Sequence, residues 1–264
     1  MTLMNDVLLG VVEGITEFLP ISSTGHLLLV EHWLGARTDA YNITIQSGAI
    51  LAVTLVFWRR IVALLTGFRL AENRGYLGKL TVAFLVTAVL GLAVKKLGFE
   101  LPTTVFPVAL ALVLGGVWML VAERLAERLP DSGVVTLRVA IAVGLAQVVA
   151  GVFPGTSRSA ATIFVAMLLG TSNRAAATEF AFLVGIPTMF AASGYEMLKQ
   201  VQAGAAMESW TSLGVAFAVS TVTAFVAVKW LLGFIRTHRF TAFAVYRLVF
   251  GGVLLALTAA GVLA

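Results

Sequence analysis

Charged side chains and cysteine are both scarce in this sequence. Its 264 residues include 18 basic and 13 acidic residues, together 12 % of the chain. An ordinary soluble domain carries about 25 %, so too few charges are present to cover a water-facing surface. With 59 % apolar residues and a mean hydropathy of +0.98, the composition excludes a soluble globular enzyme, a disordered chain and a nucleic-acid-binding protein. It predicts an all-α polytopic membrane protein.

Cysteine is absent altogether, which excludes disulfides, thiolate metal ligands and a cysteine nucleophile. The first residues, MTLMNDV, contain neither a basic n-region nor a small-residue cleavage site, so we expect no cleaved signal peptide. A net charge of +5 would indicate a polyanion-binding surface in a soluble protein. Here we assign it to Lys and Arg residues that set the orientation in a membrane.

Stretches without charged residues predict six full membrane spans, each near the length of about 20 residues that a crossing needs. They lie near 40–58, 79–95, 102–122, 175–195, 210–231 and 244–262. Two further apolar regions, 5–34 and 138–171, carry polar residues, proline or glycine in mid-stretch. Proline breaks helices, and irregular backbone at membrane depth has to be surrounded by protein or water. We therefore expect each region to form a re-entrant hairpin of two half-helices.

Most basic residues fall on one side of this six-span arrangement, in three loops or at the adjoining span ends, and the opposite side has only Arg37, Lys95, Lys96 and Lys199. The residues on the first side are Arg59, Arg60, Arg69, Arg74 and Lys79; Arg124, Arg128 and Arg138; and Arg236 and Arg239, flanked by Lys229 and Arg247. The positive-inside rule makes this side cytoplasmic. Both termini are then expected outside, with the first hairpin opening outward and the second inward.

The two hairpin regions resemble each other, which predicts an internal repeat. GVVEGITEFLPISSTGHLLLV (10–30) matches GLAQVVAGVFPGTSRSAATIF (144–164) at an offset of 134 residues. This offset pairs Gly10 with Gly144, Glu13 with Gln147, Pro20 with Pro154, Ser22 with Thr156 and Ser23 with Ser157. Because the first half contains three full spans, an odd number, the second half begins on the opposite side of the membrane and is inverted. We therefore expect one membrane domain, 1–264, with halves of about 1–130 and 131–264 in an inverted-topology repeat whose hairpin tips meet near the bilayer midplane.

Two acidic residues, Glu13 and Glu17, lie within the first hairpin. They are four residues apart and share one helix face. Acids inside a membrane are costly and mark functional sites, although an interfacial helix with both acids in water would also fit. A buried pair can hold a cation, or it can share a proton so that one member serves as acid or base.

The turn that follows reads PISSTGH (20–26). One hydroxyl is needed to cap the second half-helix, which leaves the other hydroxyls and the imidazole unexplained. Free N–H groups at a helix N-terminus bind phosphate, and glycine permits close backbone approach. The candidate phosphate ligands are Ser22, Thr24 and Gly25. Ser23 and His26 suit a hydroxyl nucleophile with a nearby base.

The second hairpin turn reads PGTSRS (154–159) and contains Arg158. An arginine in the membrane is costly unless it is paired, and its planar fork binds phosphate oxygens in a bidentate manner. Capping of a backbone carbonyl is the structural alternative. The further candidate phosphate ligands are Gly155, Thr156, Ser157 and Ser159. Asn42, Gln46 and Glu179 either line the same cavity or tie helices together by hydrogen bonds.

Over essentially its whole length the sequence resembles the undecaprenyl-diphosphate phosphatase family, the bacitracin-resistance type of bacterial inner membranes. The resemblance rests on EGITEFLPISSTGH (13–26) and PGTSRS (154–159), with no departure at the motif positions. It implies a hydrolase that removes the terminal phosphate of undecaprenyl diphosphate and returns the monophosphate carrier to peptidoglycan synthesis. It also implies an active site open to the periplasm. The catalytic residues that it implies are Glu13, Glu17, Ser23, His26 and Arg158.

Several features of the mechanism stay open at this stage. Ser23 or His26 is the nucleophile, and Glu17 or His26 is the base. Glu13 either tunes Glu17 or joins it in holding a divalent cation, Mg²⁺ or Ca²⁺; no organic cofactor is expected. The expected partners are a polyprenyl diphosphate, membrane lipid and, as one assembly, a second copy in a homodimer. The alternative function is an inverted-repeat transporter or flippase for a lipid phosphate.

Overall fold

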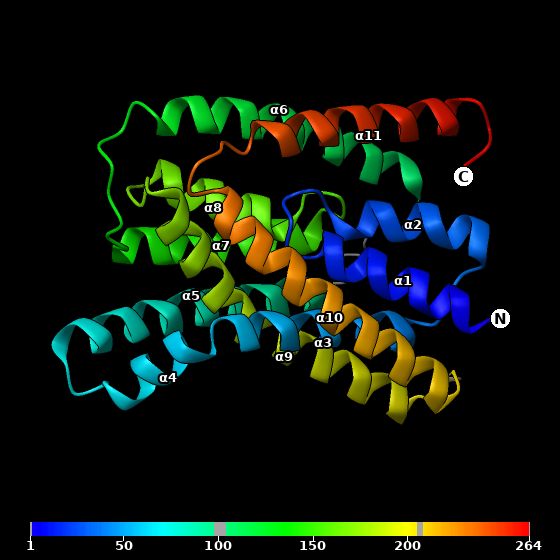
Figure 1. Cartoon of the computed structure of the whole chain (residues 1–264), viewed down its shortest axis with the longest axis horizontal. Coiled ribbons are helices and arrows are strands. Elements are labelled where there is room, and N and C mark those ends of the chain that lie inside the picture. Colours follow the sequence, from blue (N-terminus) through cyan, green and yellow to red (C-terminus); the bar gives the residue numbers. More distant parts are fainter. Residues whose placement is uncertain (1, 98–103, 205–207, 264) are drawn as a thin grey trace.

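The computed structural model describes residues 2–97, 104–204 and 208–263. Within these ranges the chain forms eleven α-helices and no strand (Figure 1). The helices are α1 (Leu3–Thr16), α2 (Ser23–Leu34), α3 (Asp39–Val56), α4 (Trp58–Thr66), α5 (Ala71–Lys96), α6 (Val105–Ala126), α7 (Leu137–Val152), α8 (Arg158–Leu168), α9 (Arg174–Gln202), α10 (Trp210–Phe234) and α11 (Thr241–Ala259).

Among the described residues, five helices are long and apolar enough to cross a membrane: α5, α6, α9, α10 and α11. A sixth span results if α3 and α4 are counted together, although the chain bends by 63° between them. These elements overlap in sequence with the six spans expected near 40–58, 79–95, 102–122, 175–195, 210–231 and 244–262, although only five of them are single helices long enough to cross. Residues 102 and 103 lie outside the described ranges. The prediction of an all-α multi-pass membrane protein is therefore confirmed.

Four short helices, α1, α2, α7 and α8, occupy the two regions where the sequence predicts broken helices. They contain 11 to 16 residues, or about 17–24 Å at 1.5 Å per residue. The hydrocarbon core is about 30 Å thick, so none of them crosses it alone. α1 and α2 are separated by residues 17–22, which contain Pro20, and α7 and α8 by residues 153–157, which contain Pro154 and Gly155.

Close packing of backbones fixes α1 and α7 in the molecule. A Cβ on Gly14 of α1 would lie 2.6 Å from the Ser220 carbonyl of α10, and one on Gly144 of α7 would lie 2.7 Å from the Ala83 carbonyl of α5. Small residues permit this approach, which is the usual basis of helix packing in membranes. The two half-helices that precede the turns are therefore each held against a long helix.

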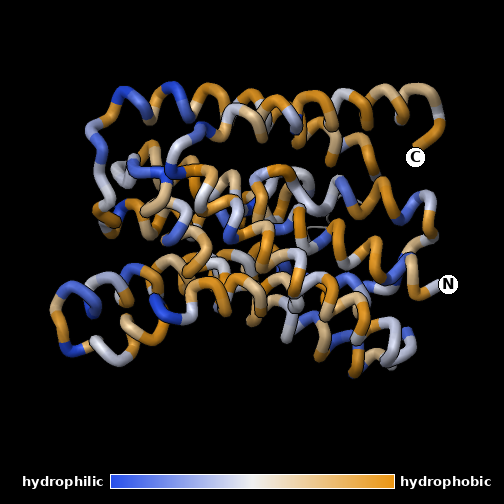
Figure 2. The backbone as a smooth tube through the Cα atoms, viewed as in Figure 1, coloured by the Kyte–Doolittle hydropathy of each residue, from blue (hydrophilic) through white to orange (hydrophobic). Residues whose placement is uncertain are grey.

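The outer surface of the bundle is apolar. Leu114 of α6, Val222 of α10 and Val249 of α11 are 60–63 % exposed. Figure 2 shows hydrophobic residues along most of the long helices and hydrophilic residues concentrated at the connecting loops. Lipid is the solvent that such a surface requires.

Candidate active site

The first turn places a serine beside a carboxylate. α1 ends at Thr16 and α2 begins at Ser23, so Glu17 and Ser23 border the same short turn. The hydroxyl Oγ of Ser23 donates a hydrogen bond of 2.5 Å to Oε2 of Glu17. Ser22, the residue before α2, has φ +71°. A non-glycine residue rarely adopts this conformation, and such backbone strain is concentrated at functional sites.

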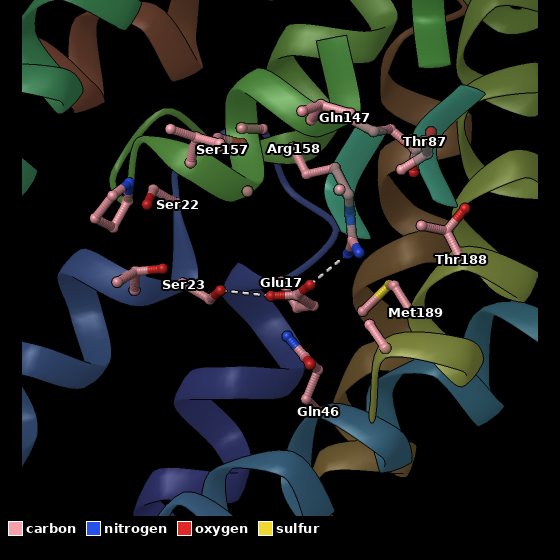
Figure 3. Close-up of a pocket in the computed structure, with 18 of the residues that line it drawn as sticks. Glu17, Ser22, Ser23, Gln46, Thr87, Gln147, Ser157, Arg158, Thr188 and Met189 are labelled. Atoms are coloured by element: carbon pink, nitrogen blue, oxygen red, sulfur yellow. Dashed lines mark hydrogen bonds and ion pairs between the residues drawn. The ribbon is translucent and has the colours of Figure 1, made fainter. Parts of the chain in front are cut away.

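The second turn supplies the positive charge. Ser157 precedes α8 with φ +66° and caps it by accepting a hydrogen bond from the N–H of Ala160. Arg158 is the first residue of α8, and its Nη2 lies 2.5 Å from Oε1 of Glu17. Figure 3 shows the Glu17 carboxylate between Ser23 and Arg158, contacted by each at a different oxygen.

The two turns also contact each other through the backbone. Ser159 Oγ donates a hydrogen bond of 3.1 Å to the carbonyl of Leu19 and lies 3.1 Å from Ser157 Oγ. The Glu17 side chain is 7 % exposed and that of Arg158 is 24 % exposed. The ion pair is thus largely removed from water, and electrostatic interactions are stronger in such low-dielectric surroundings. The arginine remains accessible from one side.

That side is a cavity of about 670 Å³. Four of the seven candidate phosphate ligands line it, together with the three residues just described: Ser22, Thr24, Gly155 and Ser157 beside Glu17, Ser23 and Arg158. The structure places the other three elsewhere. Gly25 packs against Leu112 of α6, the Thr156 carbonyl accepts a hydrogen bond from Arg247, and Ser159 is buried against Leu19.

His26 points towards α11. Its Nδ1 lies 2.7 Å from the carbonyl of Ser22 and its Nε2 lies 2.7 Å from the hydroxyl of Tyr246. The ring also stacks on Phe250, with 4.2 Å between centroids. A neutral imidazole donates from one nitrogen and accepts at the other, so both nitrogens are engaged here. His26 is not among the residues that line the cavity.

Glu13 lies one turn before Glu17 and faces a second, smaller cavity of about 350 Å³, which shares Ser23 and Thr24 with the first. The residue is 1 % exposed, and its Oε2 has no hydrogen-bond partner among the described residues. A buried carboxylate oxygen without a partner is costly. Proton or cation binding would offset that cost.

Glu13 and Glu17 differ in how well they could bind a divalent cation. Both oxygens of Glu17 are already engaged, which leaves the carboxylate of Glu13, with its unpartnered Oε2, as the available group of the pair. Within the described part of the chain, no group of three His, Asp or Glu residues could hold a metal ion. Mg²⁺ is often bound by one or two carboxylates together with substrate phosphates and water. Glu13 fits that limited role, in which the substrate and water supply the remaining ligands.

The three weaker polar candidates have different positions. Gln46 lines both cavities and Asn42 lines the second. Glu179 instead accepts a hydrogen bond of 2.8 Å from Arg60, which ties α9 to α4.

Arg247 is the site-supporting residue that the sequence interpretation missed. We predicted it at the cytoplasmic end of a span; this is wrong, because it lies nearly two turns inside α11 and is 0 % exposed. Its guanidinium donates hydrogen bonds to the carbonyls of Gly155 (3.0 Å) and Thr156 (2.9 Å) in the second turn, and to two carbonyls of α6. The signal in the sequence was a single arginine within an otherwise apolar span.

Arg247→Lys is therefore expected to lower the free energy of unfolding by about 2–4 kcal/mol, because an ammonium group cannot reach all four carbonyls and leaves buried acceptors unpaired. Thermal unfolding of the purified protein in detergent measures this as a lower Tm. Arg236→Lys, at an exposed loop position, is the matched control and should leave Tm unchanged. An unaltered Tm for Arg247→Lys would show that these hydrogen bonds do not stabilise the fold.

The fold and this site together define a polytopic membrane protein with an intramembrane serine, carboxylate and arginine cluster suited to phosphoryl chemistry. Residues 6–253 match the model of the family described as bacitracin resistance protein BacA, and the chain belongs to that family. It is 64 % identical over 265 residues to proteins from Rhizobium etli and Rhizobium johnstonii, covering 100 % of each chain. It is 62 % identical over 254 residues to a protein from Xanthomonas euvesicatoria pv. vesicatoria, covering 96 % of both chains. Each of these relatives is named undecaprenyl-diphosphatase.

Proposed function

We propose that this protein hydrolyses undecaprenyl diphosphate to undecaprenyl phosphate and inorganic phosphate, and so recycles the lipid carrier for peptidoglycan synthesis in the bacterial inner membrane. The observation that carries the proposal is the position of Glu17, whose carboxylate contacts the Ser23 hydroxyl and the Arg158 guanidinium within one cavity. The names of the relatives at 62–64 % identity support the choice of substrate.

In the first step, Ser23 Oγ attacks the terminal phosphorus and its proton passes to Glu17 Oε2. An O–P bond forms at Ser23, and the bond between the phosphorus and the bridging oxygen breaks. Undecaprenyl phosphate leaves with that oxygen. The hydrogen bond of 2.5 Å between Ser23 and Glu17 is the geometry that a nucleophile and its general base require.

In the second step, Glu17 directs water to the phosphoserine. The attacking water forms a new O–P bond as the bond to Ser23 Oγ breaks. The proton held by Glu17 returns to Ser23 Oγ, and the protons of the water leave with the inorganic phosphate. His26 is the weaker candidate for the base or the nucleophile, because its two ring nitrogens are engaged by Ser22 and Tyr246. We propose that His26 holds the backbone of the first turn in place through its contact with the Ser22 carbonyl.

Positive charge at the two turns stabilises the transferring phosphoryl group. Arg158 reaches the cavity from the start of α8, and α2 begins at Ser23 on the other side. The first N–H groups of a helix have no partner within the helix and form the positive end of its dipole. Directed at the equatorial oxygens, they act together with the arginine on the charge of the transition state.

A divalent cation is a further part of the proposal. Glu13, with its buried unpartnered Oε2, would hold it together with oxygens of the substrate's phosphates. The cation would supply additional charge neutralisation on the diphosphate. The steps described above use Ser23, Glu17, Arg158 and the N–H groups at the start of α2, and none of these steps depends on the cation.

The proposed topology is six spans with two re-entrant hairpins, related as an inverted repeat of halves 1–130 and 131–264. Helix packing supports it: α1 packs on α10 as α7 packs on α5, and α10 packs on α3 as α5 packs on α9. The residues before α2 and α8, Ser22 and Ser157, share a positive φ. These two serines are 135 residues apart. The predicted offset of 134 is therefore wrong from these serines onward, because the second turn contains one residue more than the first between its proline and the serine before the helix. Ser23 therefore corresponds to Arg158.

The cavity opens away from the basic loops. α5 begins at Ala71, beside the loop that carries Arg69, and ends near Lys95, which lines the cavity. If the basic side is cytoplasmic, the cavity faces the periplasm, and both termini lie there as well. A homodimer stays a prediction.

Phosphate release from undecaprenyl diphosphate by the purified protein in detergent tests the function, because a micelle does not separate two compartments. We expect inorganic phosphate and undecaprenyl phosphate in equal amounts. The absence of release, with transport of a lipid phosphate into vesicles intact, would overturn the proposal in favour of a transporter or flippase.

A further inference from the structure

We infer that the hydrocarbon chain of the substrate leaves the active-site cavity sideways into the lipid, between α5 and α7, at the level of Gly91 and Gly151. This inference rests on the proposed function, which supplies a lipid diphosphate as the substrate. It deepens that function by assigning a chain-binding site to residues that belong neither to the two sequence motifs nor to the catalytic cluster.

The facing surfaces of α5 and α7 change in character along their length. At the first level, Ala83 and Gly144 are in close contact, because a Cβ on Gly144 would lie 2.7 Å from the Ala83 carbonyl. One turn further along each helix, Gln147 Nε2 donates a hydrogen bond of 3.0 Å to Thr87 Oγ1. Residues four apart share a helix face, so Gly91 and Gly151 form the next level of the same seam, the line along which α5 and α7 face each other.

At this third level the seam is open. Gly91 and Gly151 both line the cavity, and a Cβ on either would meet no atom within 4 Å. Both glycines are also exposed. Leu92, which follows Gly91, and Val149 and Phe153, two residues on either side of Gly151, are exposed as well. We therefore place the two glycines where the cavity meets the surface of the bundle.

Polar groups bound the opening on two sides. On the inner side, Gln147 is 3 % exposed, lines the cavity and has an Oε1 without a hydrogen-bond partner among the described residues. One turn beyond Gly91, Lys95 of α5 forms an ion pair with Glu196 of α9, and both line the cavity. A hydrocarbon chain is excluded from these polar levels by the cost of burying polar groups against it. The glycine level between them is the apolar route.

The outer surface beside the opening is suited to lipid. Leu92 of α5 is 52 % exposed, and on the α7 side Val149 and Phe153 are 49 % and 51 % exposed. Val94, Val148 and Val152 also line the cavity, and Val152, next to Gly151, is the last residue of α7 before the second turn. Figure 3 places Thr87 and Gln147 on the α5–α7 side of Arg158. A diphosphate bound at Arg158 can therefore extend its chain along this wall without crossing a charged group.

Leucine at the two glycines tests the inference by filling the opening. Gly91→Leu, Gly151→Leu and the double variant should fold, since leucine is a better helix former than glycine and has open space at both positions. Gly78→Leu is the matched control, because Gly78 is an exposed glycine of α5 with equally open surroundings and lies outside the cavity. Two readouts are compared in detergent: turnover of undecaprenyl diphosphate, and the rise in Tm caused by inorganic diphosphate, which occupies only the headgroup site.

We expect the double variant to lose about tenfold or more of its turnover of undecaprenyl diphosphate, with the Tm shift by inorganic diphosphate unchanged and Gly78→Leu active. Turnover within about twofold of the unsubstituted protein would overturn the inference. Loss of turnover together with the Tm shift would also overturn it, since the glycines would then shape the headgroup site. Failure of the proposed function is distinguishable, because the unsubstituted protein would itself release no phosphate.

Discussion

Glu17→Gln is expected to reduce phosphate release by about 10³-fold or more, because the amide cannot accept the Ser23 proton at any stage. The amide is close in shape to the carboxylate and can still contact Ser23 Oγ, so binding of the lipid should change much less than turnover. The substitution also leaves Arg158 without its charged partner at 2.5 Å. The measurement is kcat and KM for undecaprenyl diphosphate, with the effect in kcat.

Glu179→Gln is the matched control for this substitution. Glu179 also pairs with an arginine, at 2.8 Å from Arg60, but lies outside both cavities. It should retain turnover within about twofold. If Ser23 and Glu17 act as one unit, Glu17→Gln combined with Ser23→Ala should be about as slow as either single variant. A Glu17→Gln enzyme with turnover close to that of the unsubstituted protein would contradict the role of Glu17 as the base.

Arg158→Lys should lower kcat/KM by about 10²–10³-fold. Arginine presents a planar fork that can bind a phosphate with two parallel hydrogen bonds, whereas an ammonium group is a point charge on a flexible stem. The guanidinium has donors enough to keep its contact with Glu17 Oε1 while it binds phosphate oxygens. Because lysine retains the positive charge, the fall in kcat/KM measures the contribution of the planar geometry of the guanidinium.

Arg60→Lys is the corresponding control, since Arg60 forms the exposed ion pair with Glu179. It should leave kcat/KM within about twofold. The weakening of inorganic diphosphate binding by Arg158→Lys, measured from the Tm shift, should account for part of the loss. Equal activity of Arg158→Lys and the unsubstituted protein would show that the fork does not recognise phosphate.

The helix breaks in residues 5–34 and 138–171 and most of the long apolar helices could be predicted from the sequence because their signals are local. Pro20 and the Pro154–Gly155 pair break a helix wherever they occur, and a long run of apolar residues predicts a crossing without knowledge of its neighbours. The bend between α3 and α4 was missed for the same reason. Phe57 lies at the break, with neither proline nor glycine beside it, and the Arg59–Arg60 pair that suggested a loop lies within a short helix.

Side-chain direction and tertiary contact were the parts that local signals could not supply. The motif residues Glu17, Ser23 and Arg158 come together as expected, because a turn in each hairpin brings them to the same place. His26 belongs to the same motif but points to Tyr246, a residue 220 positions away. Arg247 likewise supports the second turn from α11, and no spacing in the sequence relates it to Gly155. These contacts follow from helix packing, which a single sequence does not reveal.

Trapping of the covalent intermediate tests the central claim, that Ser23 is the nucleophile with Glu17 as its base. Undecaprenyl diphosphate labelled at its terminal phosphate is mixed with the purified protein, and the reaction is quenched within one turnover. The mechanism predicts a labelled protein whose phosphate is stable to acid and labile to alkali, located on the peptide with Ser23, and absent from Ser23→Ala. A label that is labile to acid and stable to alkali, on His26, would contradict it, as would turnover by Ser23→Ala at the rate of the unsubstituted protein.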